Sequence, residues 1–199
     1  MSGGGAEAPE ALGADEARAL LSQAGAMLDG HFLLSSGLHS DTYVQKARVL
    51  EDPRTTMVLA REMASWYREV GVVVAPAVGA VSLGFAVALA AGARSIFAER
   101  DDGRLRLRRG FRIEEGERTL VVEDVVTTGA SAAEVWELAA VGERLGVASI
   151  IDRSTDALAF PLRSVLRVDA AVWQSESCPL CLRGIPLDAP GSRHLRASS

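Results

Sequence analysis

The chain has 199 residues, 48% of them hydrophobic, which is enough for one globular domain with a full core and room for a small subdomain. Its formal net charge of −5 argues against nucleic acid as the main partner. Two cysteines do not make a disulfide framework, and the first residues lack the basic and apolar regions of a signal peptide. We therefore expect a reducing, cytoplasmic location.

The first fifty residues predict a leader, a helix and a hairpin. Residues 1–13 are rich in Gly, Ala and Glu and are expected to form a disordered leader, and residues 14–24 predict a helix. In residues 27–46, two short apolar runs flank a Ser/Gly/His turn, which predicts a hairpin ahead of the main sheet. We interpret His31 and His39 as turn or surface histidines, because a lone histidine rarely proves chemistry.

The middle of the chain is apolar over a length that would cross a membrane. Residues 70–93 carry no charge over 24 positions, which suffices for a span by hydropathy alone. Pro76 and four glycines interrupt this stretch, so we expect a strand at 72–75, a loop at 76–82 and a buried Ala-rich helix. A helix with proline in its first turn is expected before it, at 53–69. The chain is therefore not expected to enter a membrane.

An arginine-rich excursion follows a strand expected at 94–98. Residues 99–110 predict a two-stranded flap, because Leu105 and Leu107 alternate with arginines. The six arginines between positions 100 and 112 are Arg100, Arg104, Arg106, Arg108, Arg109 and Arg112. Such a cluster suits a polyanionic small molecule, with a solvated surface hairpin as the alternative. The whole chain has a single lysine, Lys46, so any role that needs a titratable ammonium has one candidate.

The chain is organised around residues 119–131. Residues 120–122 are apolar without polar alternation, which predicts a strand buried on both faces of a parallel sheet. Glu123 and Asp124 follow at once. Because burying unpaired charge costs several kcal/mol, we expect both carboxylates where the carboxyl edge of the sheet meets solvent or ligand.

A hydroxyl-rich loop then leads into a helix. Its residues are Thr127, Thr128, Gly129, Ala130 and Ser131. The glycine is free to adopt positive φ and the first N–H groups of the helix lack partners, so the loop predicts an anion cradle. Ser131 and Glu134 have the spacing of a capping box, and an apolar stripe is expected from Val135 to Leu145. An ordinary strand, turn and capped helix is the simpler alternative. Carboxylates beside an anion loop favour a ligand with vicinal hydroxyls and a phosphate, such as ribose 5-phosphate.

Two more strands are expected, at 147–151 and 164–168. Arg153 follows the first of them, at the sheet edge where the hydroxyl-rich loop is expected. A guanidinium there suits a planar carboxylate ligand. A structural ion pair with Asp152 or Asp156 is the alternative.

The C-terminal segment contains a C-x-x-C pair, Cys178 and Cys181. Zinc needs about four ligands, and the pair supplies two. A complete site would require His194 or a second subunit, so we assign no metal site from the sequence.

Three stretches carry a family resemblance. Residues 121–131 resemble the phosphoribosyl pyrophosphate (PRPP) motif of type I phosphoribosyltransferases, in which two apolar residues and two acids precede T-T-G-x-S. No Gly-Lys-Ser/Thr follows the glycine and no G-x-G-x-x-G occurs, which distinguishes the motif from other phosphate-binding loops. Residues 30–43 resemble the N-terminal hood of orotate phosphoribosyltransferases, with the pattern G-x-F-x-L-x-S-G-x-x-S followed by an aromatic residue. The tail at 178–193 is similar to that of one bacterial group of these enzymes.

The resemblance implies an α/β fold of the type I phosphoribosyltransferase kind, with a parallel central sheet flanked by helices. The core would comprise residues 53–169 of a single domain that extends from residue 14 to 199. Residues 14–50 and the tail at 170–199 would form the hood. The arginine-rich segment would be a flexible β-hairpin flap.

The resemblance also implies roles for individual residues. Glu123 and Asp124 would hold the ribose hydroxyls and favour the cationic ring. The residues of the motif implied to bind substrate are Val125, Val126, Thr127, Thr128, Gly129, Ala130 and Ser131, and those from Thr127 to Ser131 would grip the 5′-phosphate. Arg100 and Arg104 would take the place of the lysines and histidine that the family carries in the flap, and guanidinium groups neutralise pyrophosphate but are poor proton donors.

Other residues would bind orotate and pyrophosphate. Arg153, with the motif's first threonine, would recognise orotate, and Tyr43 and Val44 would pack against the orotate ring. Val78 and Gly79 fall in the family's pyrophosphate loop. Many relatives carry a lysine in that loop, so here the backbone N–H groups would hold the pyrophosphate, with side-chain help from elsewhere.

The implied activity is that of an orotate phosphoribosyltransferase. Such an enzyme transfers the 5-phosphoribosyl group from PRPP to orotate, giving orotidine 5′-monophosphate and pyrophosphate in pyrimidine biosynthesis. Mg²⁺ would arrive with PRPP and use few or no direct protein ligands. A homodimer that shares the flap across its interface is expected, without nucleic acid. The alternatives are a phosphoribosyltransferase for another base and a non-catalytic PRPP sensor that regulates pyrimidine genes.

Overall fold

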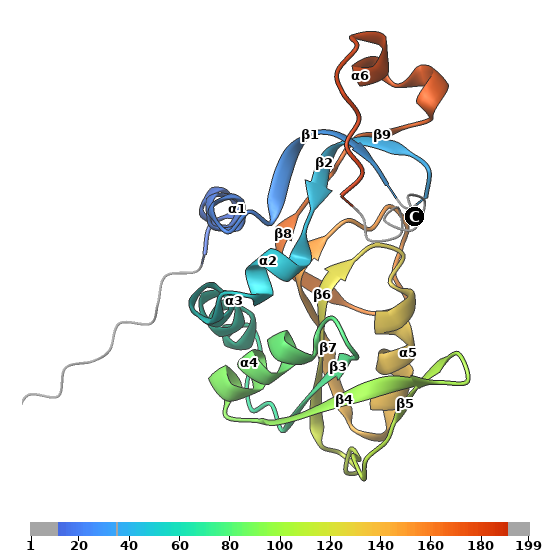
Figure 1. Ribbon diagram of the computed structural model, residues 1–199. Helices are drawn as coiled ribbons and strands as arrows, with labels where there is room; N and C mark the ends of the chain where they lie inside the picture. Colours follow the sequence, from blue (N-terminus) through green and yellow to red (C-terminus); the bar gives the residue numbers. More distant parts are fainter. Residues whose placement is uncertain (1–11, 35, 191–199) are drawn as a thin grey trace, which may run out of the picture.

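The structure is a computed structural model that describes residues 12–34 and 36–190. Residues 1–11 of the expected leader, and His194, lie outside this part of the chain. A six-stranded sheet with helices on both faces forms the body, and a three-stranded sheet lies at one end of it (Figure 1).

The helices are α1 (Ala14–Gln23), α2 (Lys46–Leu50), α3 (Pro53–Ser65), α4 (Val81–Ala91), α5 (Ala130–Leu138) and α6 (Pro179–Leu182), with short 3-10 helices η1 (Ala139–Val141) and η2 (Ser175–Ser177). The strands are β1 (Met27–Leu33), β2 (His39–Val44), β3 (Val72–Pro76), β4 (Arg94–Asp101), β5 (Arg104–Leu107), β6 (Arg118–Val126), β7 (Glu143–Asp152), β8 (Leu162–Arg167) and β9 (Val172–Trp173).

The large sheet has the order β5-β4-β3-β6-β7-β8. Its strands run parallel from β4 to β8, and β5 alone of its strands is antiparallel to its neighbour. The expected α/β fold with a parallel central sheet is therefore confirmed. Because β3 and β6 are central and parallel, the loops after them meet at one edge, where such sheets bind ligands.

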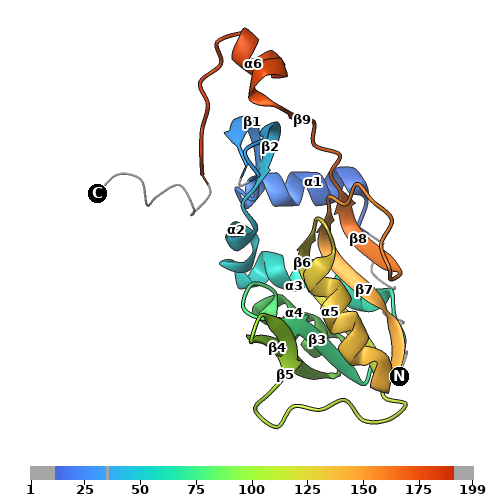
Figure 2. The same cartoon turned by 90° about the vertical axis from the view of Figure 1, so that its right-hand side faces the viewer.

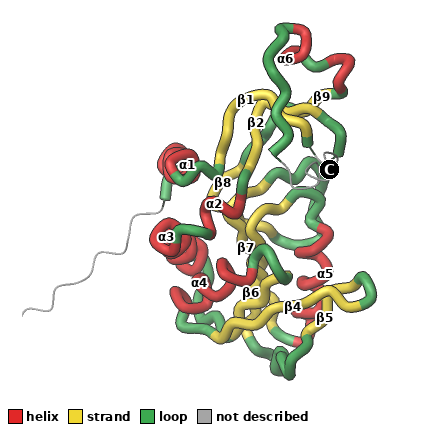
Figure 3. Tube along the Cα trace, in the orientation of Figure 1, coloured by secondary structure: helices red, strands yellow, loops and turns green. Residues whose placement is uncertain are grey.

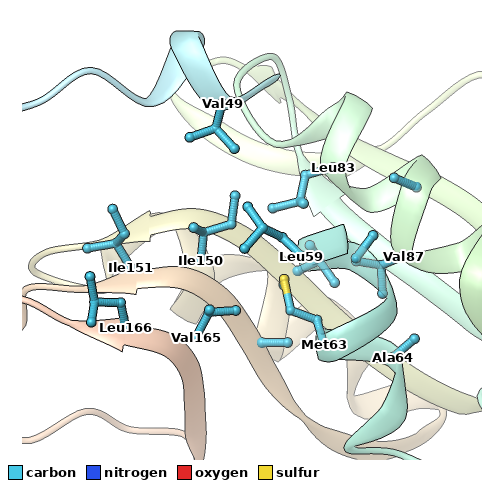
Figure 4. Packing of buried hydrophobic residues seen from close by; sticks show 14 of the residues in the cluster. Val49, Leu59, Met63, Ala64, Leu83, Val87, Ile150, Ile151, Val165 and Leu166 are labelled. Carbon is cyan, nitrogen blue, oxygen red and sulfur yellow. The ribbon is translucent and has the colours of Figure 1, made fainter. Parts of the chain in front are cut away.

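Strand β6 is buried on both faces, as its apolar run indicates. Leu120 and Val122 belong to the core cluster under α3 and α4, which includes Leu59 and Met63 (Figure 4). Val121 belongs to a second cluster beneath α5. The side chains alternate between these two cores, because successive residues of a strand point to opposite faces.

Helix α3 begins where the sequence predicts but ends earlier. The Asp52 carboxylate accepts hydrogen bonds from the backbone N–H groups of Arg54 (3.2 Å) and Thr55 (3.1 Å), which caps the helix. The helix ends at Ser65, before the expected position 69.

Helix α5 differs from its prediction at both ends. Gly129, with φ of 74°, is its N-cap, and no side chain caps it, so the expected capping box of Ser131 and Glu134 is wrong. The helix ends at Leu138, and Leu145 lies in β7. Gly142 packs against the Glu117 carbonyl oxygen, so closely that a side chain would collide with it, and this contact lets the chain turn into β7.

The small sheet joins both ends of the chain. Strands β1 and β2 form the expected antiparallel hairpin, and β9 adds to β2 through the pairs His39–Trp173 and Ser40–Val172 (Figure 2). Sequence reasoning missed β9, which has two residues and no periodicity to detect. Below, the name hood is restricted to this three-stranded sheet and the segment 174–190, which is less than the residues 14–50 and 170–199 that the resemblance implies.

Strands β4 and β5 form an antiparallel hairpin at the edge of the large sheet (Figure 3). It is the expected two-stranded flap, and Leu105 is its buried anchor, 5% exposed. Within the described residues, no helix combines the length and the apolar character that crossing a bilayer requires.

Candidate active site

The two carboxylates at the end of β6 are more buried than the sequence predicts. Glu123 is 9% exposed and Asp124 only 1%. Because side chains alternate along a strand, Glu123 points to the α5 face and Asp124 to the α3 and α4 face. Each carboxylate consequently lines its own cavity: Glu123 one with the hydroxyl-rich loop, and Asp124 one with Lys46 and Gly79.

Lys46 compensates the burial of Asp124. Its Nζ lies 2.8 Å from Oδ2 and 3.1 Å from Oδ1 of the carboxylate, and the Val125 N–H donates to Oδ1 at 2.7 Å. The lysine side chain is half-exposed at the mouth of a cavity of about 380 Å³. Sequence reasoning singled out Lys46 as the lone lysine but did not place it in the site, since this contact spans 78 residues.

The loop after β3 reaches the same ion pair. A Cβ atom on Gly79 would lie 2.8 Å from Asp124 Oδ2 and 3.1 Å from Lys46 Nζ, so this position tolerates only glycine without displacing the pair. Val78 beside it is exposed. The lysine ammonium thus stands at the loop in which a lysine was expected from the family but glycine is found.

Glu123 has a different electrostatic environment. Burial, followed by the charge of Asp124, raises the pKa of Glu123 from 4.5 to about 8, and Lys46 opposes this only weakly. Its Oε1 accepts a hydrogen bond from the Asp124 N–H at 3.1 Å. At neutral pH the site therefore contains one protonated carboxyl group and one ion-paired carboxylate.

The hydroxyl-rich loop forms a small cavity at the N-terminus of α5. The cavity measures about 80 Å³ and is lined by Glu123, Val125, Val126, Thr127, Thr128, Gly129, Ala130, Ser131 and Ala132. The cavity is small and open to solvent, and its hydroxyl groups and backbone N–H groups suit an anionic group such as a phosphate. A Cβ atom on Gly129 would lie 2.7 Å from Leu158, so both the positive φ and the packing require glycine. The N–H groups of the helix start supply an anion site here.

The flap lies beside this cavity and contacts the first turn of α5. Arg100 Nη1 is 3.1 Å from Glu134 Oε1, and Arg100 Nη2 is 3.5 Å from Ser131 Oγ. The Leu105 N–H donates to Glu134 Oε2 at 2.8 Å; this bond, with the arginines Arg100 and Arg104, lowers the pKa of Glu134. Glu134 therefore fastens the flap to α5, which explains why it does not serve as a helix cap.

Arg153 is available for a ligand. The Asp152 carboxylate is bound instead by Arg167 Nη1 at 2.7 Å, and no carboxylate of the described residues lies within ion-pair distance of the Arg153 guanidinium. Burial lowers the pKa of Arg153, while the nearby Asp41 raises it. Arg153 and Arg167 line a cavity of about 360 Å³ at the base of the hood. The alternative of a structural ion pair with Asp152 or Asp156 is wrong.

Two residues expected at the orotate ring are occupied with packing inside the hood and core. The Tyr43 ring lies against Phe32 with centroids 5.6 Å apart. Val44 packs on the core cluster below the hood. Neither lines the cavity of Arg153.

The histidines differ from their prediction. His31 and His39 are 3% and 4% exposed and lie within β1 and β2, so the interpretation as turn or surface residues is wrong. They face Cys178 and Cys181, not the active site.

Solved structures share this architecture. The crystal structure of orotate phosphoribosyltransferase from Mycobacterium tuberculosis H37Rv in complex with inorganic phosphate matches with a TM-score of 0.57 at 30% identity, over 78% of this chain and 96% of that one. Orotate phosphoribosyltransferase from Aeropyrum pernix matches in fold, with a TM-score of 0.58 at 24% identity, over 76% and 93% of the two chains. The fold and the site at the end of β6 define a type I phosphoribosyltransferase.

Sequence identity to curated relatives assigns the chain to one family within this class. Orotate phosphoribosyltransferase of Caldicellulosiruptor saccharolyticus is 47% identical over 177 residues, which cover 86% of this chain and 93% of the relative. The protein of the same name from Thermotoga petrophila is 48% identical over 183 residues, 89% and 98% of the two chains. No family model matches the chain. The chain belongs to the orotate phosphoribosyltransferase family.

Proposed function

We propose that this protein is an orotate phosphoribosyltransferase of pyrimidine biosynthesis, which transfers the 5-phosphoribosyl group from PRPP to orotate and releases pyrophosphate. The observation that carries the proposal is the end of β6, where two carboxylates and a small cavity lined by the hydroxyl-rich loop share one sheet edge. The names of the curated relatives, which align over most of their length, support it.

The two carboxylates suit different parts of the reaction. Displacement at the anomeric carbon builds positive charge on the ribose ring, and a fixed carboxylate nearby stabilises that charge. Asp124 supplies this negative charge. The two side chains face opposite sides of the strand, so protonated Glu123 would donate a hydrogen bond to a ribose hydroxyl from the α5 side and Asp124 would accept one from the α3 and α4 side. Val125, Val126 and the loop after them hold the 5′-phosphate.

Pyrophosphate would lie between the loop after β3 and the flap. Backbone N–H groups at Val78 and Gly79 and the Lys46 ammonium contact one side. Arg100 and Arg104 close from the other side, and Arg100 exchanges Glu134 for the pyrophosphate oxygens as it does so. Guanidinium groups bind such oxygens bidentately, which holds the leaving group and excludes water.

Orotate would bind between the sheet edge and the hood. Arg153 and Thr127 would recognise its carboxylate and ring, whereas Tyr43 and Val44 would reach the ring only if the hood shifted, because neither lines the cavity of Arg153. The half-buried guanidinium, which no carboxylate of the described ranges neutralises, supports this role.

Mg²⁺ fits this site as a companion of PRPP. Asp124 is already paired with Lys46, and Glu123 is protonated at neutral pH, so the protein offers no free carboxylate pair at the end of β6 as a cage for the ion. The ion, bound mainly to substrate oxygens and water, would neutralise charge on the leaving pyrophosphate.

The protein would act in the cytoplasm as a homodimer in which the flap reaches the partner's site. In the structure the β4–β5 hairpin lies at the sheet edge and Glu134 of the same chain binds its Arg100, so the flap would have to leave α5 to reach the partner's site (Figure 1). Mixed dimers of Arg100→Ala and Asp124→Asn subunits test this arrangement. If the flap acts across the interface, mixing two inactive variants restores part of the activity, whereas a flap that acts within its own subunit gives none.

A single assay tests the function. Orotate, PRPP and Mg²⁺ are incubated with the protein, and pyrophosphate release is followed with adenine, hypoxanthine and uracil in parallel. Pyrophosphate release with orotate, and with none of the other three bases, supports the proposal. A preference for another base would assign a different phosphoribosyltransferase, and PRPP binding without any turnover would favour the regulator.

A further inference from the structure

Four side chains that can bind a metal converge in the hood. His31 comes from β1, His39 from β2, Cys178 immediately precedes α6 and Cys181 lies within it. One ligand atom from each lies within 4.8 Å of the others. His31 Nε2 is 2.9 Å from His39 Nδ1 and 3.5 Å from Cys178 Sγ, and Cys181 Sγ is 3.3 Å from His39 Nδ1.

These distances fit a tetrahedral centre. With metal–nitrogen bonds of about 2.0 Å and metal–sulfur bonds of about 2.3 Å, neighbouring ligand atoms in a tetrahedron lie about 3.3 to 3.8 Å apart. The separations of His31 Nε2 from the two sulfurs, 3.5 and 3.7 Å, and of Cys181 Sγ from His39 Nδ1, 3.3 Å, fall in this range. The two histidine nitrogens, now 2.9 Å apart, would move apart by about 0.4 Å. Only small side-chain shifts are needed for an ion to enter.

The surroundings prepare the histidine ligands. His31 Nδ1 lies 2.8 Å from the Ile185 carbonyl oxygen, which fixes a proton on Nδ1 and leaves the Nε2 lone pair directed at the cluster. Both histidines and Cys178 are buried, and neither cysteine forms a disulfide. Cys181 is exposed, so the four lone-pair donors face one another at the edge of the hood, with three of them shielded from water, an arrangement that a cation stabilises.

We propose that His31, His39, Cys178 and Cys181 bind a structural zinc ion. Two imidazoles and two thiolates in a tetrahedral arrangement are a preferred zinc environment. Mg²⁺ and Ca²⁺ are disfavoured, because they prefer oxygen ligands to nitrogen and sulfur. All four positions are filled by the protein, which leaves none open for substrate. The site is therefore structural and stands independently of the proposed activity.

The ion would fasten the C-terminal segment to the N-terminal hairpin. Apart from it, the two segments are linked mainly by backbone bonds, from the Leu33 N–H to the Asp188 carbonyl and from the Asp188 N–H to the His31 carbonyl, both 2.8 Å. Apolar burial there is small, and Leu182 is 82% exposed. Small units with little core commonly depend on a metal for stability. Zinc would also fix β2, which carries Asp41 close to Arg153.

Metal content of the full-length protein tests the proposal. Protein stripped with chelator under reducing conditions is dialysed against Zn²⁺, and bound metal is measured by mass spectrometry. We expect one zinc per chain and a higher melting temperature than that of the stripped protein. Co²⁺ in place of Zn²⁺ should give absorption bands of a tetrahedral site with thiolate ligands.

Variants identify the ligands. Cys181→Ser and His39→Asn should weaken zinc binding by more than about 100-fold, a larger loss than changes outside the ligand shell produce. Ser177→Ala is the matched control beside Cys178, and His194→Ala tests the histidine that sequence reasoning considered; both should retain zinc.

Three results would overturn the proposal. The first is a failure of wild-type protein to take up zinc after full reduction, including the reduction of any disulfide that the two cysteines had formed. The second is a Co²⁺ spectrum of the wild-type protein without thiolate or tetrahedral character. This result would refute the site even if a variant failed to fold. The third is loss of zinc in His194→Ala with retention in His39→Asn.

Discussion

Replacing Asp124 by asparagine removes the negative charge of this side chain and keeps its shape. The carboxamide keeps an oxygen for the Val125 N–H, which now donates to Oδ1 at 2.7 Å. Lys46 is half-exposed, so its ammonium can be hydrated when the carboxylate charge is removed. Removing a charge that is 99% buried also relieves its desolvation. We therefore expect the melting temperature to change by no more than about 3 °C, or about 1 kcal/mol for a chain of this size.

The catalytic loss follows from the distance between the charges. A carboxylate that holds a ribose hydroxyl lies about 5 Å from the ring cation, and at an effective dielectric constant of about 20 this contributes about 3 kcal/mol. The corresponding loss in kcat is roughly 200-fold. The KM for PRPP should change much less, because the charge develops chiefly in the transition state.

Steady-state kinetics with orotate and PRPP measure these quantities, alongside a thermal melt. Asp29→Asn, an exposed aspartate of β1, is the matched control and should keep both wild-type turnover and stability. A kcat within about three-fold of wild type would refute the role of Asp124 as the stabilising charge. A fall in melting temperature beyond about 10 °C would instead make the Lys46 ion pair a structural element.

Four further changes test the rest of the site. Because the pKa of Glu123 is raised from 4.5 to about 8, wild-type stability falls as the pH rises through that window. The free energy of unfolding of Glu123→Gln should therefore exceed that of the wild type by a margin that grows with pH toward about 5 kcal/mol, while turnover falls. Lys46→Met should lower the melting temperature by about 3 °C and raise the KM for PRPP, with Lys46→Arg as control, since a buried carboxylate loses its half-exposed partner. Glu134→Ala should speed amide hydrogen exchange in the flap about five-fold, equivalent to about 1 kcal/mol for a lost bond. Arg153→Lys should raise the KM for orotate about 10-fold or more and leave that for PRPP within about two-fold, which kinetics with each substrate varied in turn would measure.

Much of the fold could be predicted from local patterns. The apolar run at 120–122, the interruptions around Pro76 and the proline at the start of α3 each act over a few residues. Such signals fix strands, turns and helix starts, because periodicity and backbone preferences are properties of short segments. The loop from Thr127 to Ser131 was identified in the same way, since a phosphate cradle is built from consecutive residues.

Errors arose where a distant segment competed for a local group. Glu134 has the spacing of a helix cap, but its carboxylate binds the flap instead, 29 residues away in sequence. Leu145 continues a helical stripe, yet it belongs to β7, because the chain turns at Gly142. In both cases tertiary contacts outweighed a modest local preference.

The sequence by itself determined the class of site: two acids and a glycine-containing hydroxyl loop after a buried strand. Only the tertiary structure decided which partners those groups meet. It pairs Asp124 with Lys46 across 78 residues and brings Cys178 to His31 across 147. The physical reason is that strand alternation and parallel crossovers, not neighbouring letters, set which side chains share a cavity, and burial there decides their charge.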